Sequence, residues 1–458
     1  MNEELEKLYE KLAYQFENRK FADLCMTLLD MEPADIAGFM EDNLDEKEQI
    51  VFFRRLPKEL ASDVFIELDS DMQESLIRAF TDKELQAVIG DMFLDDTVDI
   101  IEEMPANVIK RILKNSAPED RKQINELLAY PDDSAGSIMT PEFISFSKSL
   151  TVEEAFDKIR RTGVNKETIY TCYVTDTKKK LIGVVSVKDM LLADKKQTIE
   201  DIMDSNVIHV ETHDPREEVA LKLSRYDYLA IPVLDKEGCL VGIVTVDDAV
   251  DVIQAEATED IHKMAGVLPN EKPYLKQSVF SIWKSRVPWL LLLMVTATFT
   301  SMILSKFEER LVVVANGVLY AFVPMLMDTS GNAGNQASAT IIRAIALGDV
   351  EFKDVFKVIG KELLVSLLLA LTIGSCCFGK LLLIDRLFNS SVTVTVAAIV
   401  AGVLFISIVM AKFIGCILPL IAKKIKLDPA VVASPLITTT IDILSLVTYC
   451  LVSIAILS

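Results

Sequence analysis

The chain has 458 residues, of which 51% are hydrophobic and 25% are charged. Its charges are unevenly placed, because 58 acidic and 33 basic residues precede position 284, whereas 10 acidic and 14 basic residues follow from Lys284 onward. So acidic a first part should repel nucleic acid and membrane surfaces and attract cations, although acidity can also serve solubility alone. Seven scattered cysteines without CxxC or Cys/His spacing argue against a zinc site or a disulfide framework. No HExxH, P-loop or nucleophile-elbow motif is present, so an enzyme is not expected.

Residues 1–130 read as a stack of short amphipathic helices with an acidic surface. Segments such as LPKELASDVFIEL and DKELQAVIGDM place apolar residues at helical spacing, and Pro57 and Pro105 mark breaks. The N-terminal MNEELEKLYEKL is charged and amphipathic, so it is not a signal peptide and should stay in the cytoplasm. We expect an all-α cytoplasmic N domain.

An internal repeat follows at 137–200 and 201–256. Each copy predicts a short strand, an amphipathic helix, two apolar strands around a turn and a closing helix, and LIGVVSVKD in the first copy matches LVGIVTVDD in the second. This pattern resembles paired CBS domains of α/β structure. In such modules a Ser/Thr-x-x-Asp motif can hold the ribose of an adenine nucleotide such as ATP, and Ser186…Asp189 and Thr245…Asp248 match it. The alternative, a CBS pair that binds no nucleotide, stays open.

Residues 247–275 should connect the repeat to the rest of the chain through a long helix. The run has no Gly or Pro before Gly266, and carboxylates three and four residues apart share faces of the helix. One interpretation is a solvated acidic helix. The other is a surface that needs divalent cations to pack against a second acidic surface, so that the helix could move with ion concentration.

From residue 284 to the end, apolar runs reach bilayer-spanning length, and we predict five transmembrane helices. They are expected at about 287–305, 312–345, 363–384, 392–421 and 431–457. The basic loop KKIKLD (423–428) and the loop between the second and third spans should be cytoplasmic by the positive-inside rule, which puts the C-terminus outside.

Two polar features within these spans need a partner other than lipid. The second span contains DTSGNAGNQ (328–336), and the fifth contains Asp442 within TTTIDILSL. Close packing of small residues or a structural Asp could explain them, but a water-filled path for a cation is favoured. Hydroxyls of Thr438–Thr440 and amides of Asn332 and Asn335 are hard oxygen ligands, which suit Mg²⁺, Ca²⁺ or Mn²⁺. Because one chain offers one Asp442, a dimer around an axis is favoured.

Four stretches in order resemble the MgtE family of magnesium transporters. They are YPDDSAGSIMTPEF (130–143), TVDDAVDVIQAEATEDIHKMAG (245–266), SGNAGNQASATIIRAIALGD (330–349) and LDPAVVASPLITTTIDILSL (427–446). The resemblance implies an N domain, two CBS domains, a connecting "plug" helix and five spans, assembled as a homodimer in the bacterial plasma membrane. It implies import of Mg²⁺ and closure by cytoplasmic Mg²⁺. A transporter of Mn²⁺ or Co²⁺ and a nucleotide-sensing membrane receptor are the alternatives.

The resemblance also implies roles for individual residues. Asp442 would hold hydrated Mg²⁺ in the pore, with Asp428 at its cytoplasmic mouth and Asn332 and Ser434 beside the path. The regulatory acids would be Asp63, Asp95 and Asp99 in the N domain, Glu217 and Asp227 in the second CBS domain, and Asp248, Asp251, Glu256, Glu259 and Asp260 on the plug helix. This sequence departs from the family pattern at Ser434, Pro215 and Ser330, which puts details of the pore and of sensing in doubt but not the class.

Overall fold

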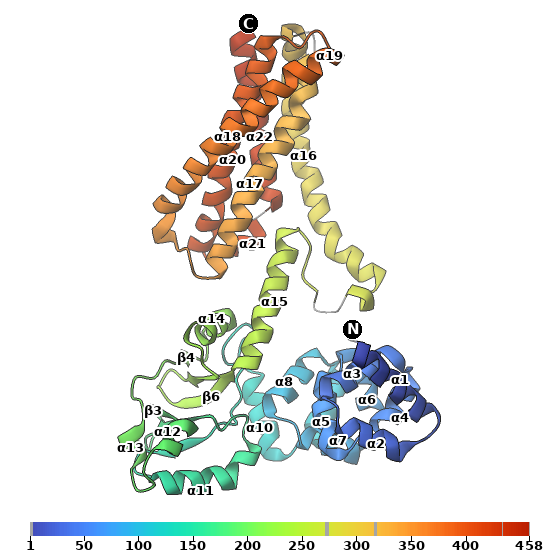
Figure 1. Cartoon of the computed structure of the whole chain (residues 1–458), viewed down its shortest axis with the longest axis vertical. Coiled ribbons are helices and arrows are strands. Elements are labelled where there is room, and N and C mark those ends of the chain that lie inside the picture. The colour runs from blue at the N-terminus through green and yellow to red at the C-terminus, as the bar shows by residue number, and fades with distance from the viewer. Residues whose placement is uncertain (1–2, 271–273, 316–317, 433, 458) are drawn as a thin grey trace. The chain divides into compact units, whose positions relative to one another are not determined.

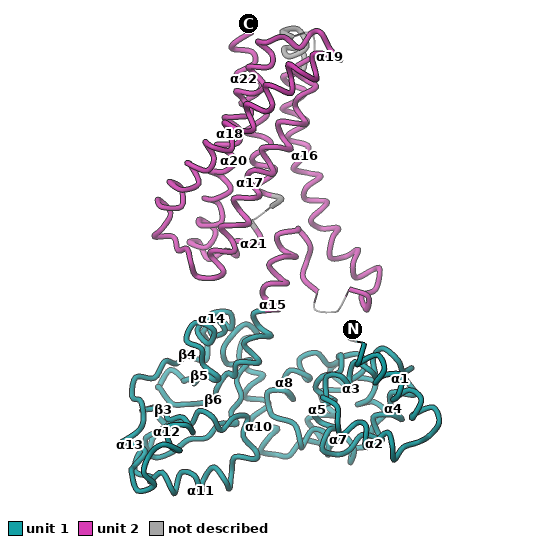
Figure 2. The backbone as a smooth tube through the Cα atoms, viewed as in Figure 1, with its two compact units in different colours: residues 1–253 teal, residues 254–458 magenta. Residues whose placement is uncertain are grey.

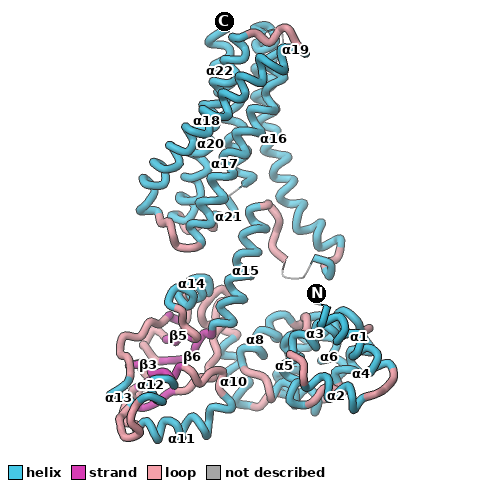
Figure 3. Tube along the Cα trace, viewed as in Figure 1, coloured by secondary structure: helices cyan, strands magenta, loops and turns pink. Residues whose placement is uncertain are grey.

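The computed structural model describes residues 3–270, 274–315, 318–432 and 434–457, and the side chains of 308–315, 432, 434 and 435 lie outside the description. The chain divides into two compact units, residues 1–253 and 254–458 (Figure 2). The first unit holds all the strands of the described chain and many short helices, whereas the second is helical (Figure 3). The predicted fold class is confirmed.

Ten short helices form the N domain. Phe39, Phe52, Phe65 and Phe80 lie in its buried core, and Asp45 and Thr81 begin two of the helices with capping boxes. The helices are α1 (Glu3–Glu17), α2 (Phe21–Leu29), α3 (Pro33–Asn43), α4 (Glu46–Phe53), α5 (Lys58–Glu67), α6 (Ser70–Ala79), α7 (Asp82–Gly90), α8 (Leu94–Glu103), α9 (Ala106–Asn115) and α10 (Pro118–Leu127).

The sequence repeat forms two three-stranded sheets of the same topology, with strand orders β1-β2-β3 and β4-β5-β6. In each sheet the first pair is parallel and the second antiparallel. The strands are β1 (Ser145–Ser147), β2 (Thr171–Thr175), β3 (Leu181–Ser186), β4 (Val210–Glu211), β5 (Ala230–Leu234) and β6 (Leu240–Thr245). The helices of this region are α11 (Val152–Thr162), η1 (Gly163–Asn165), α12 (Val187–Leu192), α13 (Ile199–Ile202) and α14 (Arg216–Tyr226).

The glycine shared by LIGVV and LVGIV has a steric reason. A Cβ at Gly183 would lie 2.7 Å from Met203 Sδ and 3.2 Å from the Asp204 carbonyl oxygen. A Cβ at Gly242 would meet Met139 Sδ at 2.7 Å and the Thr140 carbonyl oxygen at 3.0 Å. A chain segment therefore crosses closely over the same strand position in both copies, and only glycine leaves room for it.

The connecting helix α15 (Val246–Met264) contributes residues to both units. It ends at Met264 rather than continuing to 275, because Gly266 adopts a left-handed conformation (φ +68°) and Pro269 follows. Residues 271–273 of the predicted range lie outside the described residues.

The second unit is a bundle in which α20 packs against α17, α18 and α22, while α16 contacts α22 (Figure 1). Gly415 of α20 lies so close to α17 that a Cβ would sit 2.3 Å from the Gly334 carbonyl oxygen. The long helices are α16 (Val279–Ala315), α17 (Val323–Ala346), α18 (Val355–Lys380), α20 (Val394–Lys424) and α22 (Ser434–Leu457). The short elements are η2 (Tyr274–Lys276), η3 (Val318–Phe322), η4 (Phe352–Asp354), η5 (Leu381–Asp385), α19 (Arg386–Phe388) and α21 (Pro429–Val432).

Four described helices are long and apolar enough to cross a membrane, in the ranges Val279–Phe307, Phe352–Phe388, Val394–Lys424 and Leu436–Leu457. Helix α17 is the fifth long helix of the second unit. It is not among these four, because the polar run 328–336 lowers its mean hydropathy. The predicted second span, 312–345, begins too early, because α16 continues to Ala315 and α17 begins only at Val323. The sequence pattern assigned 312–315 to the second span because Leu311–Val314, the end of the first helix, is as apolar as the spans themselves.

Candidate cation sites

Carboxylates from several elements of the first unit gather around α8. Asp95, Asp96 and Asp99 lie on α8, Glu167 lies just before β2, and Asp248 lies in the first turn of α15. The charge of Asp95 acts on Asp99, Glu167 and Asp248. We call these five residues the α8 acid cluster. It joins the N domain, the first CBS domain and the start of the connecting helix.

Burial, which disfavours the charged form of a carboxyl group, is the largest cause of raised pKa values in this cluster, and neighbouring acids add to it. The pKa rises to about 7 for Asp95, to about 6 for Asp96 and to about 8 for Asp99. It rises to about 8 for Glu167 and to about 7 for Asp248. One oxygen of Asp95, Oδ1, is buried without a hydrogen-bond partner among the described residues. A divalent cation would supply the positive charge that these groups otherwise take from protons.

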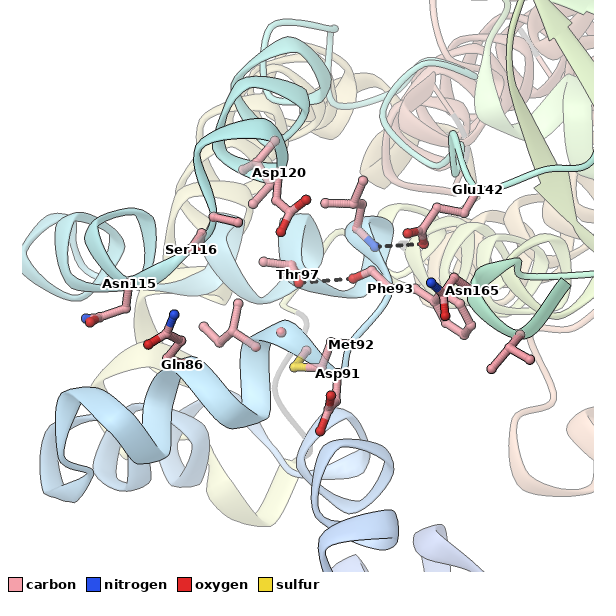
Figure 4. A pocket seen from close by; sticks show the side chains of 16 residues that line it. Gln86, Asp91, Met92, Phe93, Thr97, Asn115, Ser116, Asp120, Glu142 and Asn165 are labelled. Carbon is pink, nitrogen blue, oxygen red and sulfur yellow. Dashed lines mark hydrogen bonds between the residues drawn. The ribbon is translucent and has the colours of Figure 1, made fainter. Parts of the chain in front are cut away.

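Glu142 of the first CBS domain fixes the beginning of the acidic helix. Its Oε2 accepts a hydrogen bond from the backbone N–H of Leu94, the first residue of α8, at 3.3 Å (Figure 4). A carboxylate at a helix N-terminus also interacts favourably with the helix dipole. Glu142 borders a cavity of about 510 Å³ between α7, α8 and α10, with Gln86, Asp91 and Asp120 among its lining. The contact holds the α8 acid cluster in register with the CBS domain.

Other predicted regulatory acids lie on neighbouring elements. Asp63 on α5 is close enough for its charge to act on Asp96, and Asp251 lies one turn beyond Asp248 on α15. Glu217 lies in the first turn of α14, and Asp227 ends that helix in a left-handed conformation (φ +54°).

A second charged site lies in the second unit, at the end of α15. The ammonium of Lys263 lies 2.6 Å from Glu259 Oε1 and 2.6 Å from Asp428 Oδ2. Burial opposes the charged form of Lys263, but its hydrogen bonds to Asp428 and Glu259 outweigh burial and raise its pKa. Burial, followed by the charge of Asp428, raises the pKa of Asp260. Glu256 lies one turn before Asp260 on the same helix. The predicted acids Glu259 and Asp428 are therefore brought together, with a lysine between them.

Apolar contact holds the same end of the helix in place. Met264, the last residue of α15, packs against Ile342 of α17 and Ala430 of α21. The other oxygen of Asp428 accepts the backbone N–H of Ala430 at 2.8 Å. The seat for α15 is thus built from the ends of α17 and α21.

Helix α22 runs antiparallel to α17 and is joined by polar contacts to α17 and to η3, which precedes α17. Tyr449 donates to the Leu319 carbonyl oxygen at 2.7 Å, Ser445 Oγ to Ser330 Oγ at 3.0 Å, and Thr438 Oγ1 to Asn335 Oδ1 at 3.2 Å. Helix α22 therefore lies in a fixed register along the polar run of α17.

Asp442 faces α17 within this register. A Cβ at Gly331 would lie 3.7 Å from Asp442 Oδ1 and 3.2 Å from Thr438 Cγ2, so glycine makes room for the carboxylate. Asp442 Oδ1 is buried and has no hydrogen-bond partner among the described residues. The predicted Asn332 donates to Asp328 Oδ1 at 3.2 Å, and the side chain of Ser434 lies outside the described residues. A carboxylate oxygen without a donor, among hydroxyls and amides, suits a hard cation.

The two Ser/Thr-x-x-Asp motifs have the same geometry. Ser186 Oγ donates to Asp189 Oδ2 at 2.5 Å, and Thr245 Oγ1 donates to Asp248 Oδ2 at 2.5 Å. Their surroundings differ, because Asp189 is exposed whereas Asp248 belongs to the α8 acid cluster.

Known families match most of the chain. A divalent cation transporter family matches residues 323–452, the MgtE intracellular N domain matches 31–133, and CBS domains match 135–196 and 199–255. A magnesium transporter MgtE of Thermus thermophilus is 35% identical over 449 residues, covering 97% of each chain. One of Bacillus subtilis is 30% identical, covering 94% of this chain and 93% of its own. The chain belongs to the MgtE family of magnesium transporters.

Solved structures agree with the fold of about half of this MgtE family member. The crystal structure of the soluble part of a magnesium transporter matches with a TM-score of 0.52 and 31% identity, covering 55% of this chain and 99% of the other. The cytosolic domain of the Mg²⁺ channel MgtE in complex with ATP matches with a TM-score of 0.51 and 33% identity, covering 53% and 99%. The predicted family is confirmed.

Sequence reasoning missed several charged residues at these sites. Asp96 and Glu167 join the α8 acid cluster, and only the folded chain brings Glu167 to α8. Lys263 was not singled out, although its place four residues after Glu259 allows an ion pair on one helix face. Lys412 of α20 and Glu362 of α18 were also missed; they form a largely buried ion pair at 3.8 Å, and Glu362 precedes the predicted third span by one residue.

The α8 acid cluster predicts a pH-dependent response to Mg²⁺. Its pKa values of about 6 to 8 exceed the usual 3.8 to 4.5, so without a cation the folded arrangement loses stability as pH rises from about 4 through about 8. Because Mg²⁺ binds ionised carboxylates, it should slow hydrogen exchange of α8 in the full-length protein more at pH 8 than at pH 6. Equal slowing at both pH values would contradict this prediction.

Lys263→Gln should loosen the end of α15 when Mg²⁺ is absent. The substitution removes the ammonium that neutralises Glu259, Asp260 and Asp428 and leaves the three carboxylates close together. Their repulsion should then move the end of α15 away from α17 and α21. We expect residues 259–266 to exchange backbone hydrogens about tenfold faster in Mg²⁺-free buffer.

Lys361→Gln, which removes an exposed lysine of α18, is the matched control and should leave that exchange unchanged. If Lys263→Gln exchanges like the wild type, the lysine does not hold the seat.

Proposed function

We propose that this MgtE family member is a channel that imports Mg²⁺ across the plasma membrane and is closed by Mg²⁺ bound on its cytoplasmic side. The observation that carries this proposal is Asp442, a carboxylate inside a helix bundle whose buried oxygen has no donor among the described residues. A carboxylate in such a place is costly unless it meets a cation or a polar path.

The chemistry of the surroundings favours a hydrated divalent ion. Mg²⁺ gives up its water reluctantly, so a permeating ion would keep its shell and be held through water molecules. Asp442 would attract the ion, while Thr438 and Asn335 beside it would orient the shell, and Asn332 and Ser434 complete the expected lining. The same oxygen ligands would accept Mn²⁺, which is the closest alternative substrate.

A homodimer would enclose this path. Asp328, Asn332, Gln336 and Thr340 are exposed at intervals of four residues along α17. Such a polar stripe on a membrane-spanning helix cannot face lipid, and a second copy related by a twofold axis would cover it with the same surface. The two copies would also bring two Asp442 carboxylates to one ion. With the basic loop 423–428 in the cytoplasm, the N-terminus lies inside and the C-terminus outside.

The acidic sites supply the gate. When cytoplasmic Mg²⁺ is scarce, the ionised α8 acid cluster repels itself, and bound Mg²⁺ would remove that repulsion and draw α8, the CBS domains and α15 together. Asp63, Glu217, Asp227 and Asp251 would extend this surface in the first unit. Glu256, Glu259, Asp260 and Asp428 would act at the pore mouth, where Lys263 already supplies one positive charge. The expected division into an N domain (1–130), two CBS domains (137–200 and 201–256), the plug segment (247–275) and a membrane domain (284–458) follows these roles.

A nucleotide would act on the CBS domains. The related cytosolic domain was crystallised with ATP, and we propose that this chain binds an adenine nucleotide at Ser186 and Asp189. Asp189 of this motif is exposed, so its carboxylate could accept a hydrogen bond from a ribose hydroxyl. The second motif, Thr245 and Asp248, is engaged in the α8 acid cluster, so cation and nucleotide would compete there.

Asp442→Asn should abolish Mg²⁺ uptake while the protein stays folded. The amide keeps the size of the side chain but removes the charge that attracts the ion, so a magnesium-requiring strain that depends on this protein should fail to grow on low Mg²⁺. Asp349→Asn, an exposed aspartate beyond the end of α17, is the matched control and should sustain growth. Wild-type uptake by Asp442→Asn would remove the assignment of Asp442 to the pore.

A further inference from the structure

The proposed mechanism assigns no ion-binding role to Asp328, an acid of the polar stripe on α17. Asp328 lies near the beginning of α17, is exposed, and accepts a hydrogen bond from Asn332 Nδ2 at 3.2 Å. The Asn332 amide fixes one carboxylate oxygen on the polar face of the helix. A charged group in this position is costly against lipid, so its surroundings must be aqueous or polar.

The register of the two helices places Asp328 near Asp442. Gly331, which makes room for Asp442, follows Asp328 by three residues, so the two positions lie on one face of α17 about 4.5 Å apart along its axis. The charge of Asp328 acts on the Asp442 carboxylate. Ser330 pairs with Ser445, and Leu319 with Tyr449, so Asp328 lies on the side of Asp442 toward the end of α22 at Leu457.

We propose that Asp328 forms a second station for the hydrated divalent cation, one helical turn from Asp442 toward the C-terminal end of α22. This inference rests on the proposed function, which puts that end outside, so Asp328 would receive the ion before Asp442 does. Two carboxylates in sequence along a path keep a cation attracted while it moves from one to the other.

Two observations distinguish this arrangement from a pair of solvated surface acids. Asp442 Oδ1 is buried without a donor among the described residues, which points to a cation as its partner. Asn332, at the next turn of the stripe, donates to Asp328 and leaves the other oxygen of that carboxylate to contact an ion's water shell. A purely structural Asp328 would need only the hydrogen bond to Asn332, which an asparagine can also accept.

Uptake by the full-length protein in cells depleted of cytoplasmic Mg²⁺, measured against external Mg²⁺ concentration, tests the inference. Asp328→Asn keeps an acceptor for Asn332 but removes the charge, so the concentration for half-maximal uptake should rise about tenfold, the lower end of the range for charge focusing in a cleft. Asp328→Glu, which restores the charge, should stay within about twofold of the wild type. Abundance in the membrane and size-exclusion behaviour of each variant report on folding.

The outcomes separate this inference from the proposed function. If Asp328→Asn takes up Mg²⁺ like the wild type at every concentration while Asp442→Asn is inactive, the second station is wrong and the pore assignment stands. If Asp328→Glu is as impaired as Asp328→Asn, the role of Asp328 is not charge and the inference also fails. If Asp442→Asn itself transports normally, the proposed path is wrong, and a defect in Asp328→Asn alone would then have to be structural.

Discussion

Carboxylates held close together and partly out of water impose the main constraint on this protein. Burial and mutual repulsion both disfavour their charged forms and raise the pKa values in the α8 acid cluster to about 6 to 8. At neutral pH such a cluster needs protons, cations or separation. We propose that closure of this fold depends on cations that hold these acids together, and that Mg²⁺ is the cation in this MgtE family member.

The same electrostatic problem is solved three ways along the chain. In the first unit, Glu142 fixes the N-terminal end of α8. Among the described residues, the acids of the α8 acid cluster have no basic partner as close as Lys263 is to Glu259 and Asp428. At the end of α15, that lysine supplies a positive charge between Glu259 and Asp428. Between α17 and α22, Asp442 has neither a lysine nor a donor at its buried oxygen within the described residues. We therefore propose that the α8 acid cluster senses the cation, that the Lys263 site holds the end of α15, and that Asp442 lies on the ion path.

Much of this organisation could be predicted from the sequence because it depends on local pattern. The repeated LIGVV and LVGIV motifs predicted two like domains, and the structure explains their glycine by a chain crossing at each. Spacing of carboxylates along the connecting helix identified Asp248 and Asp251 as candidates, whereas Asp95 and Asp99 were indicated only by the family resemblance. The cost of a charge within an apolar run singled out Asp442. Asp95, Asp99 and Asp248 come together in the α8 acid cluster, and the roles of all these residues stay predictions.

The remaining features depend on contacts between distant segments. Glu167 reaches α8 only through the packing of the CBS domain on the N domain, and Lys263 reaches Asp428 across 165 positions of sequence. The boundary between α16 and α17 was misplaced because hydropathy does not register a break between two apolar helices. Asp328 was seen within a polar run, but its relation to Asp442 required the register of α17 against α22.

The most direct test of the account is the ionic current through membrane patches that hold the full-length protein, with Mg²⁺ varied only at the face that exposes the cytoplasmic half. We predict a Mg²⁺-carried current when that face is free of Mg²⁺, and its loss when millimolar Mg²⁺ is added there. A current that is the same with and without Mg²⁺ at the cytoplasmic face would contradict the claim that the acidic half closes the channel in response to the ion it carries.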